Sequence, residues 1–330
     1  MLSTGFKITV KKATFLFLIF GFFFLTFRLG LALEQKIQIN DTNETFIVEK
    51  GDSLYGILNK IEKKYGLSST WWVRFRYIFK DYPIIKAGRY NIFNNSSVSE
   101  LIERFEEGDV QLFKFSIIEG TVAQSNLSKL EKLILEENLK FNIPPEVAKL
   151  LSKEGQIMPD TYFFSDDQDL VKVLTDSKDF LEKLLADEWK NKPEGNPLKS
   201  PEEALVLASI IEREAVLQSE QNTIASVFLA RLKIGMKLQA DPTSSYGYYQ
   251  DYGEKIGRVV LDDKNLYNTY QIKGLPPGPI CFPSATAIKA AINSLPGEYF
   301  YFVARGDGSH IFSKTYEEHN KAVKKYIYSK

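Results

Sequence analysis

An uncharged N-terminal run constrains this chain more than any other feature of its sequence. Residues 13–27 carry no charge, and the apolar stretch continues past Arg28 to Leu33, 21 residues in all. A helix of that length crosses the roughly 30 Å hydrocarbon layer of a bilayer. The sequence therefore predicts a transmembrane anchor at residues 13–33, with the folded part of the chain after it.

Charges beside this run predict its orientation. Lys7, Lys11 and Lys12 precede it, and positive residues mark the cytoplasmic end of a span. We therefore expect residues 1–12 to form a cytoplasmic tail of a single-pass protein of the cytoplasmic membrane, with the remainder on its outer side. A cleaved signal peptide is the alternative, but residues 31–33 (LAL) lack the small-x-small cleavage pattern.

Composition excludes several classes of function. Lys+Arg and Asp+Glu both total 42, and this zero net charge disfavours a nucleic-acid partner held by phosphate attraction. Cys281 is the only cysteine, so thiolate metal clusters are ruled out, and we expect it to be a small buried hydrophobe. The only histidines are His310 and His319. We expect them to be structural, and we expect no metal or cofactor.

The first part of the outer region predicts a small α+β unit. Residues 34–44 are polar and indicate a linker. Residues 45–118 then predict strands at 46–48, 88–92 and 110–118 and helices at 54–65, 71–79 and 97–105. Ser53 is the expected cap of the first helix, and Ser97 with Glu100 predicts a capping box on the last. The opening VEKGDSLYGIL resembles a LysM-like module, so this subdomain has either a glycan-binding or a purely structural role.

Residues 119–330 predict a mainly helical domain with short strands, so the fold class of the whole chain is α+β. We expect an extended stretch at 155–164, a long irregular region at 235–283 and paired strands at 299–304 and 310–313. The expected helices are 121–136, 144–151, 170–189, one opened by Pro201, 220–234, 284–294 and 315–326. No internal repeat is apparent in the sequence.

Glu214 stands out on the helix that Pro201 opens. At 100° per residue, it projects within about 20° of Leu207 and about 40° of Ile210. Arg213 projects to the opposite side, and Glu212 lies at the far edge of the apolar stripe. A carboxyl held against apolar walls has a raised pKa and becomes a general acid near neutral pH. The alternative is a half-buried structural ion pair.

Two polar clusters in the irregular region are candidates for ligand contact. Residues 238–243 and 267–270 bring Gln, Asp, Asn, Thr and Tyr close to the Pro- and Gly-rich stretch 274–280. These side chains hydrogen-bond hydroxyl and acetamido groups, as sugars require. The alternative is ordinary turn chemistry with polar side chains facing solvent.

Taken in order, these motifs resemble the YceG-like family, the membrane-anchored endolytic murein transglycosylases. The resemblance spans residues 14–328. It is carried by the anchor, the LysM-like unit and the stretches 86–90, 110–120, 159–162, 207–215, 225–228, 231–232, 235–236, 238–243, 267–270, 274–280, 302–304, 310, 312 and 319–320. No single motif is specific, but their number and order are.

The resemblance implies an enzyme, a lyase that cuts the bond between N-acetylmuramic acid and N-acetylglucosamine within peptidoglycan strands and leaves 1,6-anhydro ends. Glu214 maps to the catalytic position. The resemblance also implies termination of nascent glycan elongation, with cell-wall synthesis enzymes as partners. The candidates for sugar contact are Gln239, Asp241, Thr243, Asn268, Tyr270, Asp160 and Tyr162. Asp241 is also the candidate second carboxylate of a muramidase, and a non-catalytic peptidoglycan-binding scaffold is the other alternative.

Overall fold

The structure is a computed structural model that describes residues 3–39, 44–67, 70–77, 83–252 and 256–328. It divides into two compact units, Met1–Phe113 (unit 1) and Lys114–Lys330 (unit 2). Each unit is described by itself. The predicted boundaries of the tail, the anchor, the linker, the LysM-like subdomain and the catalytic domain stay predictions. Residues 40–43 of the predicted linker lie outside the described residues.

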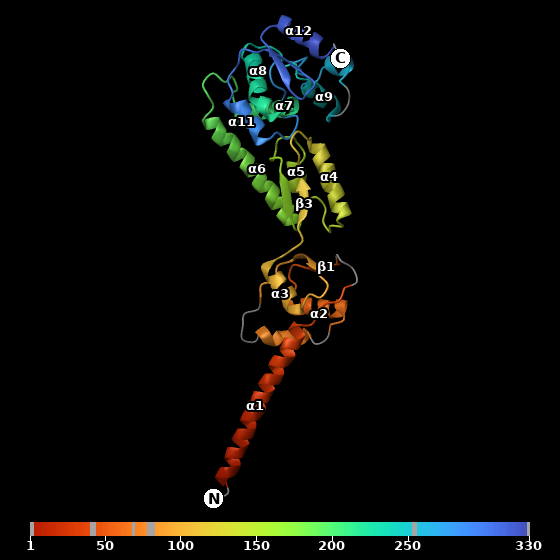
Figure 1. The fold of residues 1–330 in the computed structure, drawn as a ribbon, viewed down its shortest axis with the longest axis vertical. Helices are drawn as coiled ribbons and strands as arrows, with labels where there is room; N and C mark the ends of the chain where they lie inside the picture. The colour runs from red at the N-terminus through yellow and green to blue at the C-terminus, as the bar shows by residue number, and fades with distance from the viewer. Residues whose placement is uncertain (1–2, 40–43, 68–69, 78–82, 253–255, 329–330) are drawn as a thin grey trace. The chain divides into compact units, whose positions relative to one another are not determined.

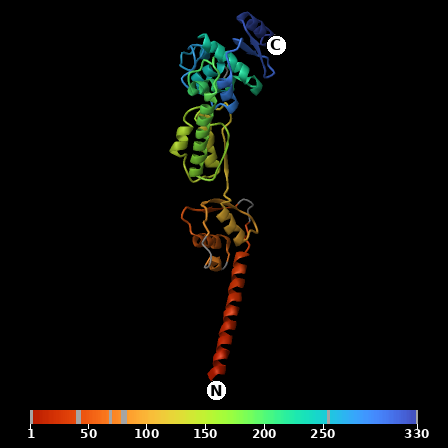
Figure 2. The same ribbon diagram turned by 90° about the vertical axis from the view of Figure 1, so that its left-hand side faces the viewer.

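Unit 1 begins with one continuous helix, α1 (Ser3–Leu33), visible in Figures 1 and 2. Its Lys12–Leu33 part is long and apolar enough to cross a membrane and is almost entirely exposed. The C-terminal end packs on the rest of unit 1, where Ala32 is buried beside Leu54 and Val73. The Arg28 guanidinium lies 5.5 Å from the ring centre of Trp72. The rest of unit 1 therefore holds the end of this helix in place.

The rest of unit 1 packs two antiparallel strands against short helices. Phe46 pairs with Tyr90, and both side chains are buried. The predicted cap and capping box are confirmed: Ser53 Oγ accepts from the Gly56 N–H, and Ser97 and Glu100 bond reciprocally. The order is β1 (Glu44–Val48), α2 (Leu54–Tyr65), the 3₁₀ helix η1 (Thr70–Tyr77), β2 (Gly88–Ile92) and α3 (Val98–Glu107).

Two predicted elements of this region differ from the structure. The helix expected at 71–79 is the 3₁₀ helix η1, and residues 78 and 79 lie outside the described residues. The strand expected at 110–118 is only Phe113–Ser116. The N–H of Val110 bonds to Gly108 within a turn, before the strand begins.

Unit 2 is mainly helical, and its described strands form two short pairs, β3 with β4 and β5 with β6. Its strands are β3 (Phe113–Ser116, which begins at the unit boundary), β4 (Thr161–Phe164), β5 (Tyr301–Ala304) and β6 (His310–Ser313). Its helices are α4 (Ala123–Glu136), α5 (Pro145–Leu150), α6 (Asp167–Lys190), α7 (Pro201–Glu214), η2 (Gln218–Glu220), α8 (Gln221–Lys233), α9 (Asp241–Tyr249), α10 (Arg258–Asp262), α11 (Ala285–Asn293) and α12 (Tyr316–Tyr326). The predicted α+β class is confirmed as a mixed helical fold with short strands.

Helix α7 packs against both α8 and α11 in the core of unit 2, and α8 and α11 also contact each other (Figure 1). The sequence predicts one apolar stripe on this helix, but Val206 and Ser209 on its other sides are also buried. Ser209 is tolerated there because its Oγ accepts the Ile280 N–H (3.0 Å) and donates to the Val206 carbonyl. Its carbonyl accepts from Cys281, which is fully buried as predicted.

The region expected to be irregular, 235–283, contains two helices, α9 and α10. Helix α9 lacks apolar periodicity because its buried positions are Thr243, Ser244 and Ser245. The Thr243 and Ser244 hydroxyls bond to the loop that holds Asn268 and Thr269, and the Ser245 hydroxyl donates to the Asp251 carbonyl. A helix whose buried face is polar leaves no hydrophobic pattern in the sequence.

Candidate active site

Glu214 is the last residue of α7 and lies in the wall of a cavity of about 470 Å³. The helix is fixed at its start by Ser200, whose Oγ accepts the Glu203 N–H, and along its length by the core. The carboxyl is therefore presented from a rigid element. We call this space the Glu214 cavity; its other lining residues are Arg231, Gln239, Asp241, Tyr270, Tyr301, Phe302, Val303, Ala304, His310, Tyr316, His319, Val323 and Ile327.

The surroundings keep Glu214 protonated near neutral pH. Burial is the main cause and the negative charge of Asp241 the second, and together they raise the pKa of Glu214 to about 8. The positive charges of Arg231 and Arg213 oppose this shift without cancelling it. The negative end of the α7 dipole also disfavours an ionised carboxylate there. The predicted raised pKa is thus present, and it gives Glu214 a proton to donate.

Two of the predicted sugar contacts, Asp241 and Tyr270, are coupled in the wall of this cavity. The Tyr270 hydroxyl donates to Asp241 Oδ1 at 2.6 Å, and Lys237 Nζ donates to the Tyr270 carbonyl at 2.7 Å. Gln239 also lines the cavity and has a φ of 47°. A non-glycine residue in this left-handed region costs conformational energy, which often marks functional loops.

Asn268 and Thr243, in contrast, do not reach the cavity. Both side chains are fully buried. Asn268 Nδ2 donates to three backbone carbonyls of residues 260–263, and its Oδ1 accepts from Ser244 and from the Tyr270 N–H. Thr243 bonds to Ala240 and Thr269. The structure places them as supports of the loop that carries Tyr270, because their polar atoms are used internally.

Asp160 and Tyr162 lie in a different place. They line a separate cavity of about 250 Å³ with Met158, Ser177 and Phe180. The Tyr162 hydroxyl bonds to the Met158 carbonyl and to Ser177 Oγ, and burial raises the pKa of this phenol to about 12. The structure does not bring these two residues to the Glu214 cavity.

Arg231 is a cavity residue whose role the sequence analysis missed. Only 6% of its surface is exposed. Its Nε donates to the Phe300 carbonyl (2.7 Å) and its Nη1 to the Leu238 carbonyl, so it ties α8 to two loops. The guanidinium also lies 5.5 Å from the ring centre of Tyr301. An arginine inside an apolar helical stretch is the one sequence signal that points to it.

The two histidines, expected to be structural, both line the Glu214 cavity. Glu220 accepts from the His310 backbone N–H (3.1 Å), and its other oxygen lies 2.7 Å from His310 Nδ1. His319 stacks on Tyr301 with ring centres 5.4 Å apart, and its buried Nδ1 has no hydrogen-bond partner in the part of the chain that the structure describes. The separation of 90 positions between Glu220 and His310 explains why no local pattern reveals this pair.

Glu212 faces away from the cavity, as predicted. Its Oε2 accepts the N–H of Ser284 (3.0 Å) and the Ser284 hydroxyl, at the start of α11. Arg213 stands between Glu212 and Glu214 in the sequence, and its guanidinium lies 3.7 Å from the ring centre of Tyr252. Within the described ranges, no three His, Cys, Asp or Glu side chains lie close enough together to hold a metal ion.

Comparison with known proteins agrees with this geometry. The model of the YceG-like family matches residues 46–325. The chain belongs to the YceG-like family. It is similar to the endolytic murein transglycosylase of Bacillus subtilis, with 29% identity over 90% of this chain and 89% of that protein's length.

Further YceG-like relatives extend this result. The endolytic murein transglycosylase of Streptococcus pneumoniae is 27% identical over 90% of this chain, which spans 61% of that protein. A putative YceG-like protein from Listeria monocytogenes, whose crystal structure is known, has a TM-score of 0.53 and 27% identity over 86% of this chain and 99% of its own. The relatives' names confirm the prediction of an enzyme of the lytic transglycosylase class, a lyase.

Proposed function

We propose that this chain is a membrane-anchored endolytic transglycosylase that cuts the bond between N-acetylmuramic acid and N-acetylglucosamine within peptidoglycan strands. One observation carries the proposal: a single carboxyl, Glu214, has a pKa of about 8 in a cavity lined by hydrogen-bonding and aromatic side chains. Membership of the YceG-like family supports the substrate class.

The reaction needs one group that gives a proton and then takes one back. Protonated Glu214 donates to the glycosidic oxygen as the bond from C1 of the muramyl sugar to that oxygen breaks. The muramyl 2-acetamido group stabilises the positive charge that develops at C1. The ionised Glu214 then accepts the proton of the muramyl C6 hydroxyl as its oxygen bonds to C1. The product is a 1,6-anhydro ring, water is not consumed, and Glu214 ends protonated as it began.

The surrounding groups have separate tasks in this proposal. Asp241 keeps Glu214 protonated and places a negative charge beside the developing positive charge at C1. Gln239 and Arg231 donate hydrogen bonds to sugar hydroxyl and acetamido groups, and the Tyr270 oxygen, whose proton is donated to Asp241, accepts one from a sugar hydroxyl. Tyr301 and Tyr316 offer flat faces to the apolar sides of sugar rings. Asn268 and Thr243 act through the loop that they hold.

A muramidase is the second candidate, and Asp241 is the observation that favours it. Most glycosidases use two carboxylates, and Asp241 is close enough to raise the Glu214 pKa. In such an enzyme Asp241 would activate water or attack C1, and the product would carry a reducing muramic acid end. We prefer the transglycosylase because the relatives are named for that reaction.

The remaining parts of the proposal concern location. The Lys12–Leu33 helix is proposed as a single-pass anchor in the cytoplasmic membrane, with a cytoplasmic N-terminus and unit 2 on the outer side. The LysM-like segment is proposed either to bind glycan or to have a purely structural role. Termination of nascent glycan strands and partnership with cell-wall synthesis enzymes complete the proposal, with no nucleic-acid partner.

Digestion of purified sacculi by the full chain in detergent tests the function, with Glu214→Gln as the matched inactive variant. Mass spectrometry of the muropeptides should find 1,6-anhydro ends from the wild type and none above background from the variant. Reducing muramic acid ends would identify a muramidase. Strands left intact by the wild type would identify a non-catalytic binding protein.

A further inference from the structure

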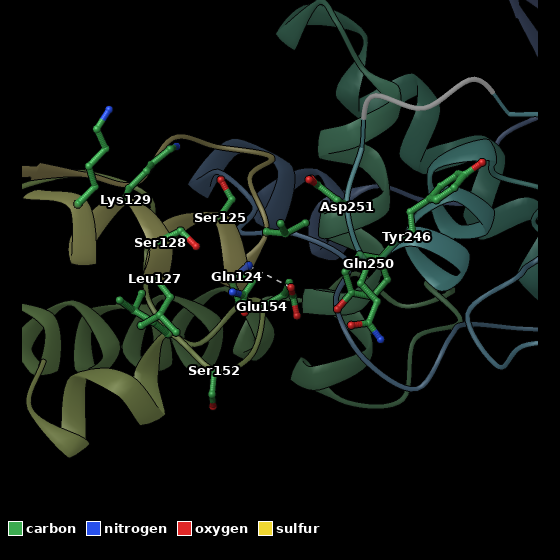
Figure 3. Close-up of a pocket in the computed structure, with 15 residues that line it drawn as sticks. Gln124, Ser125, Leu127, Ser128, Lys129, Ser152, Glu154, Tyr246, Gln250 and Asp251 are labelled. Atoms are coloured by element: carbon green, nitrogen blue, oxygen red, sulfur yellow. Dashed lines mark hydrogen bonds between the residues drawn. The ribbon is translucent and has the colours of Figure 1, made fainter.

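Unit 2 contains a second and larger cavity that the proposed reaction does not use. It has a volume of about 950 Å³ and lies between the start of α4 and the end of α9 (Figure 3). We call it the α4–α9 cavity. Its chemistry comes from Ser125, Lys129 and Lys132 of α4, from Glu154, and from Tyr246 and Asp251 at the opposite wall.

Opposite charges line the two sides of this cavity. Lys129 and Lys132 both belong to α4, and Lys132 Nζ lies 3.5 Å from Glu136 Oε1 of the same helix. Glu154 lies between the α4 side chains and Asp251 (Figure 3). Glu154 is fixed, because its Oε1 accepts the N–H of Ala123 (3.1 Å). Lys129 is exposed and has no ion-pair partner among the described side chains. The cavity is thus suited to a ligand that carries both carboxylates and an amine.

Helix α9 joins this cavity to the Glu214 cavity. Its first residue, Asp241, lines the Glu214 cavity, and Tyr246 and Tyr249 near its end line the α4–α9 cavity. Eight residue steps along a helix amount to about 12 Å. A flexible extension of the substrate bound at Glu214 can therefore reach the second cavity if it is longer than that.

We propose that the α4–α9 cavity binds the peptide stem carried by the muramyl sugar of the strand that is cut at Glu214. This inference rests on the proposed function. A stem of five residues extends to about 17 Å, which is longer than the about 12 Å along α9 from Asp241 to Tyr249. The stem has free carboxylates and, on its diamino residue, a free amine. Lys129 and Lys132 pair with the carboxylates, Glu154 and Asp251 pair with the amine, and the hydroxyls of Ser125 and Tyr246 bond to the stem amides.

A direct binding experiment tests the site without any need for catalysis. The free pentapeptide stem with an unmodified amine is titrated into the full chain in detergent micelles, and the dissociation constant is measured by calorimetry. We expect Lys129→Glu to weaken binding by about threefold to tenfold, because reversing an exposed charge changes an attraction into a repulsion. Lys183→Glu, on the exposed face of α6, is the matched control and should bind as the wild type does.

The opposite wall is tested with a modified probe. Acetylation of the stem amine should weaken binding to the wild type by about threefold. It should weaken binding to Asp251→Asn less, because only Glu154 is then left to pair with the amine. Equal binding of the stem by the wild type and Lys129→Glu would overturn the proposal, as would failure of the wild type to bind the stem.

Cleavage gives an independent readout. Strands that keep their stems should be cut with a lower KM than strands stripped of stems by an amidase, and Lys129→Glu should raise KM only for the first substrate while kcat stays the same. If the chain binds the stem but cuts neither substrate, the proposed function is refuted and the binding site remains supported. A chain that cuts both substrates equally would refute the stem site and leave the function intact.

Discussion

The last turn of α7 presents two identical side chains to two different environments. On one face, Glu212 accepts two hydrogen bonds from Ser284 and holds the start of α11. On the other face, Glu214 lies in a cavity beside Asp241, and its pKa is about 8. Two residue steps turn a helix by about 200°, so the neighbours and not the residue type decide the role of each acid.

The difference has a clear physical origin. Hydrogen-bond donors satisfy an ionised carboxylate, so Glu212 can stabilise the fold. Glu214 meets burial, a like charge and the negative end of the helix dipole, all of which favour its neutral form. A structural acid and a proton donor can therefore occupy one helical turn.

The largest expected effect separates the two acids by activity. Glu214→Gln keeps the size of the side chain but removes the transferable proton, so the release of anhydro-muropeptides should fall by about 100-fold or more. Glu212→Gln, the matched control on the other face, should stay within about threefold of the wild type because it touches no reacting atom. Turnover retained by the Glu214 variant would refute its assignment.

The second effect is on stability as a function of pH. The folded pKa of Glu214 is about 8 against an ordinary 4.5, so between these values the native state binds more protons than the unfolded state. The free energy of unfolding should therefore fall as pH rises through this window. In Glu214→Gln this loss should disappear, which makes the variant more stable than the wild type at pH 8 by about 2–4 kcal/mol.

Urea unfolding at pH 4.5 and pH 8 measures this effect. Glu212→Gln should keep the pH dependence of the wild type. If the free energy of unfolding changes with pH equally in Glu214→Gln and Glu212→Gln, Glu214 is not the group that retains its proton in the native state.

A third effect sharpens the role of Asp241. Removing its charge in Asp241→Asn should lower the Glu214 pKa, because the like charge is the second cause of its elevation. Since the protonated form is the active acid, the alkaline fall of kcat/KM should move to lower pH, by about one unit at most. Tyr270→Phe removes the hydrogen bond to Asp241 but leaves the negative charge of Asp241 in place. This variant should therefore move the alkaline fall of kcat/KM much less. An unmoved profile in Asp241→Asn would show that burial alone sets the pKa.

The smallest effect concerns the structural acid. Glu212→Gln should lower the free energy of unfolding by about 1 kcal/mol, because a charge-assisted bond to Ser284 becomes a neutral one. Ser284→Ala tests the same contact from the other side. Thermal unfolding of both single variants and the double variant should give losses that do not add. Fully additive losses would mean that the two side chains do not interact energetically.

Several features of this protein are determined by the sequence alone because they depend on neighbours along the chain. The apolar helix, the caps at Ser53 and Ser97 and the paired strands near the C-terminus follow from length, spacing and local bonding. The direction of Glu214 is also local, since a helix fixes the angle between residues a few positions apart. For this reason the helical geometry distinguishes Glu214 from Glu212 before any tertiary contact is known.

The composition of the cavity, in contrast, was decided only by tertiary structure. Asp241 bonds to Tyr270 across 29 residues, and His310 meets Glu220 across 90. The sequence predicts polar loops, but it does not reveal that Thr243 and Asn268 face inward or that Arg231 and both histidines line the Glu214 cavity. Hydrogen bonds between distant segments leave no periodic trace in the sequence. They exist only because the packing of α7, α8 and α11 brings these segments together, and that packing sets the protonation of Glu214.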